Sequence, residues 1–176
     1  MATERSTELK RLLDELVILP DPMSGEPGYV EPGQKAQLVF AQAVGNFLNG
    51  GPELLDDATE HLWAYYRSVV LEFTAAERTD YGIPELLATA DIWEQVEFRE
   101  PPSKQLGEPP LEPALSYISF EGEVSWEPEH GLQLVFEHGL RLCKVGPYDG
   151  HNTNAHAAGD LSVLDVVFLD RRSRPT

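Results

Sequence analysis

The segment from Leu115 to Val145 constrains the fold of this chain most strongly. From Leu115 to Trp126 apolar and polar side chains alternate, which is the period of a strand with one buried face. One face is predicted to carry the core side chains Ile118, Phe120, Val124 and Trp126. The opposite face carries Tyr117, Glu121 and Glu123, so we expect it to be solvated or to line a polar groove.

A hairpin is predicted to follow this strand. Residues 132–136 and 140–145 are apolar runs around Glu137-His138-Gly139, where Gly139 can adopt the positive φ that a tight turn needs. Residues 92–98 and 161–169 are also predicted to be strands. Residues 100–113 contain five prolines and are expected to form a long surface loop, either a lid or a family-variable insertion.

Helices are predicted in the N-terminal half. Residues 3–16 carry leucines at helical spacing, although residues 16–19 could instead form a strand, and the Pro- and Gly-rich residues 20–28 disfavour regular structure. Residues 34–48 and 52–73 each carry an apolar stripe, and Asn49-Gly50-Gly51 separates them. So short a connection predicts an antiparallel helix pair laid on the sheet. The Tyr65-Tyr66 pair lies on the second stripe and is expected to pack in the core.

These elements predict an α+β fold with a single domain, in which an antiparallel helix pair packs on a mainly antiparallel β-sheet. A chain of 176 residues with 41% hydrophobic content can bury about 70% of the surface that its unfolded form exposes. Residues 1–30 are assigned to an N-terminal helix or strand with its loop, residues 31–170 to the α+β domain, and residues 171–176 to a basic tail.

A compact W-x-x-E-H-G signature extends from Trp126 to Gly131. The chain resembles a family of uncharacterised bacterial domains in which a strand that ends in an acidic residue and Trp runs through Glu-His-Gly into a hairpin. Further matching features are Glu123, Tyr65-Tyr66, Pro84-Glu85-Leu86-Leu87, Val145-Gly146 and Asp149. The resemblance covers roughly residues 30–150, and it implies a fold more than a function because the family has no established activity.

The chain is strongly acidic, with 30 acidic and 13 basic side chains and a formal net charge of -17. The charge is concentrated between residues 36 and 140, which hold 19 acidic and only four basic residues. Such a surface repels nucleic acid and anionic lipid and accelerates encounter with basic partners. Acidity that serves solubility alone is the alternative.

The sequence favours a cytoplasmic protein. No run of apolar residues approaches the roughly 20 that a membrane span needs, and the charged N-terminus is unlike a secretory signal. The single cysteine, Cys143, cannot form an internal disulfide, and on an apolar strand it is expected to be buried and inert.

Carboxylates and imidazoles are grouped after the signature, in Glu127, Glu129, His130, Asp149, His151, His156 and Asp160. Such side chains bind Zn²⁺, Mn²⁺ or Fe²⁺, but the spacing matches no standard metal motif. The alternative is structural: Pro128 and Gly131 shape a turn, Trp126 closes the core, and His130 bonds the backbone while Glu129 or Glu123 orients its ring.

Two functions follow from these patterns. The first is a non-enzymatic, immunity-like acidic protein that grips a basic protein partner and needs no cofactor, with Trp126, Glu129, His130, Asp149 and His151 as binding residues. The second is a metal-dependent hydrolase or small-ligand-binding domain. Its metal ligands would be Glu129, His130, Asp149, His151 and His156.

Overall fold

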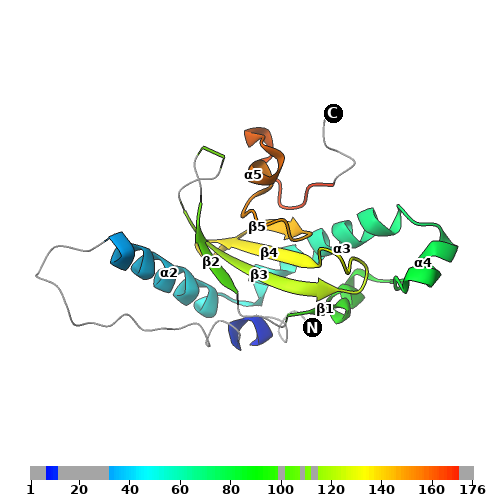
Figure 1. The fold of residues 1–176 in the computed structure, drawn as a ribbon. Coiled ribbons are helices and arrows are strands. Elements are labelled where there is room, and N and C mark those ends of the chain that lie inside the picture. The colour runs from blue at the N-terminus through cyan, green and yellow to red at the C-terminus, as the bar shows by residue number, and fades with distance from the viewer. Residues whose placement is uncertain (1–6, 12–31, 99–101, 108–109, 112–114, 171–176) are drawn as a thin grey trace, which may run out of the picture.

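The computed structural model describes residues 7–11, 32–98, 102–107, 110–111 and 115–170. Its centre is an antiparallel sheet in which β3 (Ser116–Val124), β4 (Leu132–Glu137) and β5 (Arg141–Gly146) are consecutive neighbours (Figure 1). Two short strands, β1 (Val96–Glu97) and β2 (Ser103–Leu106), pair with opposite ends of β3. The prediction of an α+β domain with an antiparallel sheet is confirmed.

The predicted helices are present on the core face of the sheet. Helix α2 (Pro32–Asn49) ends next to Gly50 and packs mainly on β3. The second predicted helix begins as a 3₁₀ turn, η1 (Pro52–Leu55), and continues as α3 (Asp56–Val70), which packs on β5 and on the 3₁₀ helix η2 (Thr89–Gln95). A short helix, α4 (Ala75–Tyr81), follows, and none of its side chains is buried.

Three phenylalanines join α2 to the sheet. The ring of Phe47 lies 5.1 Å from that of Phe120 on β3 and 5.0 Å from that of Phe136 on β4, and all three side chains are buried. The predicted core face of β3 is therefore correct at Phe120, and Ile118, Val124 and Trp126 are buried with it. Aromatic rings at centroid separations of this kind attract each other, and this attraction stabilises the fold beyond the contribution of burial alone.

Residues 92–98 are not the predicted strand. They mostly belong to η2, and only Val96 and Glu97 pair with β3. Adjacent side chains Ile92 and Trp93 are both buried, which a strand with one buried face does not allow, and Trp93 Nε1 donates to Thr59 Oγ1 on α3 over 2.8 Å. Packing against α3 thus overrides the alternating pattern.

The predicted loop at residues 100–113 contains a strand that the sequence pattern missed. Strand β2 pairs with β3 from Ser103 opposite Ser119 to Leu106 opposite Ser116. None of the side chains of β2 is fully buried, so the strand needs no alternation of apolar residues, and its sequence, Ser-Lys-Gln-Leu, shows none. The rest of the Pro-rich stretch is described only at residues 102, 107 and 110–111.

The predicted strand at residues 161–169 is also wrong. It begins as a 3₁₀ turn, η3 (Leu161–Val163). The bond from Val145 N–H to Val167 O over 2.8 Å and the ion pair between Asp165 and Arg141 on β5 over 3.6 Å tie this segment to the sheet. Asn154 Nδ2 donates to the carbonyls of Val166 and Val167 over 2.7 and 3.0 Å. The Asn154 side chain thus satisfies backbone carbonyls of this segment that would pair with a neighbouring strand if the segment were part of the sheet.

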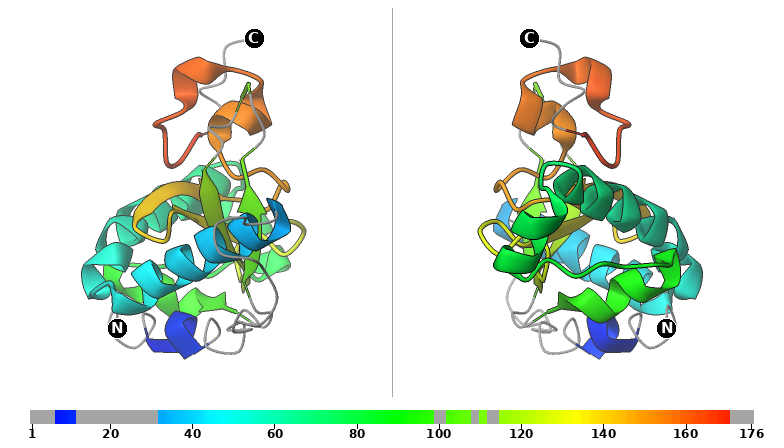
Figure 2. Two further views of the ribbon diagram at one scale, coloured as in Figure 1. Left: turned by 90° about the vertical axis from the view of Figure 1, so that its left-hand side faces the viewer. Right: turned by 90° about the vertical axis from the view of Figure 1, so that its right-hand side faces the viewer.

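The second face of the sheet is covered at one end. Tyr117, Val135 and Cys143 are buried there, and Cys143 Sγ lies 3.6 Å from Asn152 O in the segment that leads to α5 (Asn154–Ala158). Both views in Figure 2 place α5 and residues 160–170 at the opposite end of the molecule from residues 7–11. The expected solvation of this face is thus wrong for Tyr117, whereas Glu121 is half-buried and Glu123 is exposed. The expected burial of Cys143 is confirmed.

Predictions near the N-terminus fall mostly outside the described residues. Residues 7–11 are helical, and the rest of the predicted helix at 3–16 and the loop at 20–28 lie beyond the described ranges. In the part of the chain that the structure describes, no helix is both long and apolar enough to cross a membrane.

Truncation of Phe47 tests the aromatic contact between α2 and the sheet. Phe47→Ala removes a buried ring from contact with two others and is expected to lower the free energy of unfolding by about 3–5 kcal/mol. Leu38→Ala is the control on the same helix, because Leu38 is 52% exposed, and it should change stability by no more than about 0.5 kcal/mol. Urea denaturation measures the free energy of unfolding of both variants. Equal losses of stability would contradict the assignment of Phe47 as the contact between α2 and the sheet.

Candidate functional site

The turn between β3 and β4, residues 125–131, is held from below by aromatic side chains. Trp126 is 1% exposed, and its ring meets those of Tyr65 and Tyr66 edge-on at 5.9 and 5.6 Å. The hydroxyl of Tyr65 donates to the carbonyl of Gly131 over 2.9 Å, and that of Tyr66 donates to Pro84 O over 2.8 Å. The prediction that the tyrosine pair packs in the core is therefore confirmed.

Gly131 closes the turn through its backbone. It has a φ of +58°, and its N–H donates to Glu127 O over 2.9 Å. A Cβ at this position would lie 2.4 Å from Gly122 O on β3, so the turn and the strand approach closely only because residue 131 lacks a side chain.

His130 does not lock the turn as the structural interpretation expected. Its side chain is 47% exposed, and Nδ1 lies 3.3 Å from Glu127 Oε1. The carboxylate that contacts the imidazole is thus that of Glu127, which the interpretation did not name, and a Glu129 ligand atom lies within 4.8 Å. The backbone carbonyl of His130 does contribute, because it accepts from Tyr148 N over 3.0 Å.

Two adjoining pockets lie beside this turn, with volumes of about 520 and 270 Å³, and both are lined by Glu97, Glu123, Pro128 and Gly131. Together they form a surface that we call the glutamate groove. Its acidic side chains are Glu94, Glu97, Glu121, Glu123, Glu127 and Glu129. Among the described residues, no lysine or arginine lines either pocket.

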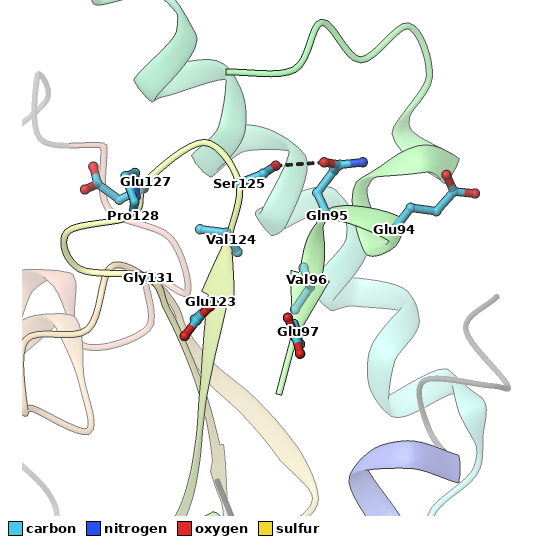
Figure 3. Close-up of a pocket in the computed structure, with 10 residues that line it drawn as sticks. All are labelled: Glu94, Gln95, Val96, Glu97, Glu123, Val124, Ser125, Glu127, Pro128 and Gly131. Atoms are coloured by element: carbon cyan, nitrogen blue, oxygen red, sulfur yellow. Dashed lines mark hydrogen bonds between the residues drawn. The ribbon is translucent and has the colours of Figure 1, made fainter. Parts of the chain in front are cut away.

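The larger pocket lies where β1 meets β3 (Figure 3). Glu97 and Glu123 are directly opposite each other on these antiparallel strands. At one end, Ser125 Oγ donates to Gln95 Oε1 over 2.8 Å (Figure 3). The backbone N–H of Ser125 also donates to Gln95 O over 3.3 Å. These bonds tie the start of the turn to the end of η2 and set the shape of the pocket wall.

The structure divides the residues that the sequence grouped as a site. Glu129 and His130 lie together with Glu127, with one ligand-type atom from each within 4.8 Å of the others. Asp149 and His151 instead belong to a group around Lys144, whose Nζ donates to Asp149 Oδ1 and, over 2.8 Å, to His151 O. The rings of His151 and His156 lie 4.3 Å apart, beside this second group.

Asp160 has a separate role. Its carboxylate accepts from Ser162 N–H over 2.8 Å and caps η3. This hydrogen bond holds the pKa of Asp160 below its usual value, because it stabilises the ionised form. Asp160 is therefore the N-terminal cap of a 3₁₀ turn.

Lys144 is a central residue that the sequence reasoning missed. Its side chain is 1% exposed, on the face that also buries Cys143, because a β-bulge opposite Val135 and Phe136 shifts the register of β5. The available signal was a lysine within an apolar strand with an aspartate five residues later. A buried ammonium needs such a partner.

Glu94 and Glu97 are groove residues that the sequence did not assign to a site. They come from η2 and β1, which the tertiary structure brings beside the end of β3. Glu121 and Glu123, in contrast, carried a usable signal, because their alternation on β3 predicted a polar face that could line a groove.

The fold and the groove define a class: a small α+β domain whose helices cover one sheet face and whose β3–β4 turn borders an acidic surface. The chain belongs to the family described as a domain of unknown function, DUF6985, whose model matches residues 25–152. This confirms the expected membership in a family without an established activity. Comparisons with curated proteins and with solved structures gave no significant match.

Substitution of Gly131 tests the closure of the turn. Gly131→Ala combines a positive φ with a backbone clash and is expected to lower the free energy of unfolding by more than about 2 kcal/mol. Gly150→Ala is the matched control, since Gly150 also has a positive φ of 80° but an added Cβ meets no atom within 4 Å. Thermal and urea unfolding should rank the control as the milder change. The reverse order would contradict the close approach to Gly122.

A double-mutant cycle tests the ion pair between the buried Lys144 and Asp149, whose side chain is 32% exposed. Asp149→Asn leaves the buried ammonium without its charged partner and is expected to cost about 3–5 kcal/mol of unfolding free energy. Lys144→Met leaves only a partly exposed carboxylate and should cost less. The double variant should cost clearly less than the sum, because both charges are then removed. Additive losses in urea denaturation would show that the two side chains are not coupled.

Proposed function

We propose that this protein is a non-enzymatic binding protein that holds a basic protein partner in the glutamate groove. The observation that carries the proposal is the groove itself, in which six glutamates line two adjoining pockets. Lysine and arginine side chains are the complementary groups for such a surface, and an extended basic loop would span both pockets.

The charge of the whole chain supports the same partner chemistry. A net charge of -17 attracts a cationic protein over long range and raises the association rate at low ionic strength. The same field disfavours nucleic acid and anionic membranes. An immunity-like role, in which an acidic protein covers a basic surface of its target, fits this charge pattern.

The contents of the groove support binding more than catalysis. The Ser125 hydroxyl in the groove donates to the Gln95 amide oxygen, which is not a base that could activate a nucleophile. Asp149 and His151 contact Lys144 and do not belong to the cluster of ligand-type side chains that includes Glu129 and His130, so the five-residue hydrolase site is not proposed.

We assign the protein to the cytoplasm, where the thiol of the buried Cys143 would stay reduced.

Capture on the immobilised protein tests this function. A native lysate is applied, a salt ramp is used for elution, and mass spectrometry identifies what was retained. We expect a basic protein bound near one-to-one and released by salt, because exposed ion pairs are screened. Its affinity is then measured by calorimetry with purified components.

The groove is tested with paired charge variants. Glu97→Gln with Glu123→Gln should weaken the captured partner's binding about tenfold, since each exposed ion pair contributes up to about 1 kcal/mol. Glu53→Gln with Glu60→Gln removes the same charge from exposed positions on η1 and α3 and should change the affinity by less than about twofold. Equal weakening by both pairs, or no salt-sensitive basic partner, would rule out recognition by the groove.

A further inference from the structure

Three ligand-type side chains meet on the exposed side of the β3–β4 turn. Glu127, Glu129 and His130 each place one potential metal-ligand atom within 4.8 Å of those of the other two residues. The set combines one imidazole with two carboxylates, which are the nitrogen and oxygen ligands that zinc sites use. The imidazole distinguishes it from an ordinary patch of surface acids.

The spacing between two of these ligand atoms fits a shared metal ion. His130 Nδ1 and Glu127 Oε1 lie 3.3 Å apart, at the long end of the range for a hydrogen bond. Two ligands bound at about 2.1 Å in a tetrahedral arrangement lie roughly 3.4 Å apart. The pair is therefore separated as two ligands of one ion would be, and a ligand atom of Glu129 lies within 4.8 Å of the other two side chains' ligand atoms.

The three side chains differ in how far they are exposed to solvent. Glu127 is only 18% exposed and also lines a small pocket with Tyr65 and Phe168, so its carboxylate is the anchored ligand. Glu129 and His130 are exposed and line the 270 Å³ pocket. An ion held by all three would keep at least one coordination position open toward that pocket.

We propose that Glu127, Glu129 and His130 bind one divalent transition-metal ion of the zinc type. The imidazole selects such an ion over Mg²⁺ and Ca²⁺, which prefer oxygen ligands. The negative field of the neighbouring groove glutamates raises the local concentration of cations. This site goes beyond the basic-partner proposal and does not depend on it, because Glu129 and His130 border the groove whether or not a protein binds there.

Calorimetric titration of the tag-free protein with Zn²⁺ alone tests the site, with Mg²⁺ titrated in parallel. We expect one Zn²⁺ per chain and no saturable binding of Mg²⁺. Glu129→Gln and His130→Gln should each weaken Zn²⁺ binding at least tenfold, because each removes one of the three ligands. Both side chains are exposed, so folding should be retained, and circular dichroism checks this.

Two matched variants separate coordination from general electrostatics. Glu94→Gln removes a groove charge outside the ligand set, and His151→Gln removes an imidazole from the Lys144 group. Both should bind Zn²⁺ within about twofold of the wild type. The proposal is overturned if Zn²⁺ shows no saturable one-to-one binding, or if either control variant loses as much affinity as the ligand variants.

Discussion

The close contact between Gly131 and Gly122 is the constraint on which the rest of the site depends. Because residue 131 has no Cβ, the β3–β4 turn folds back to within van der Waals contact of β3. The Tyr65 hydroxyl then reaches Gly131 O from α3, and Trp126 fills the space beneath. The same turn presents Glu127, Glu129 and His130 outward, so a core contact determines where the acidic side chains lie.

The two proposals use different parts of one acidic surface. Lysine or arginine side chains of a partner would engage Glu97 and Glu123 between β1 and β3, whereas a metal ion would take the turn residues at the edge. A dication there would reduce the negative charge of the groove, and by thermodynamic linkage a basic partner and the ion would weaken each other's binding. The buried Lys144, in contrast, holds the segment before α5 against the other sheet face through Asp149 and the carbonyl of His151.

Local patterns predicted the long elements well and the short ones poorly. The apolar stripes of α2 and α3 and the alternation of β3 correspond to real burial, as at Phe47, Leu62 and Phe120. Residues 92–98 alternate as well, yet Trp93 is drawn into the core beside Thr59 and a 3₁₀ helix results. Strand β2 is stabilised by pairing with β3 and not by its own polar sequence, so no local pattern could identify it.

The sequence by itself determined the α+β class, the antiparallel hairpin, the buried Trp126 and the acidic charge, because each depends on composition or on a repeat within one segment. Only the tertiary structure decided which acids share a surface. Glu94 and Glu97 reach the groove because η2 packs on α3 and β1 pairs with β3, and Asp149 leaves the predicted site because the β5 bulge turns Lys144 inward to meet it. Contacts between residues far apart in the chain are set by packing and register, which local periodicity does not encode.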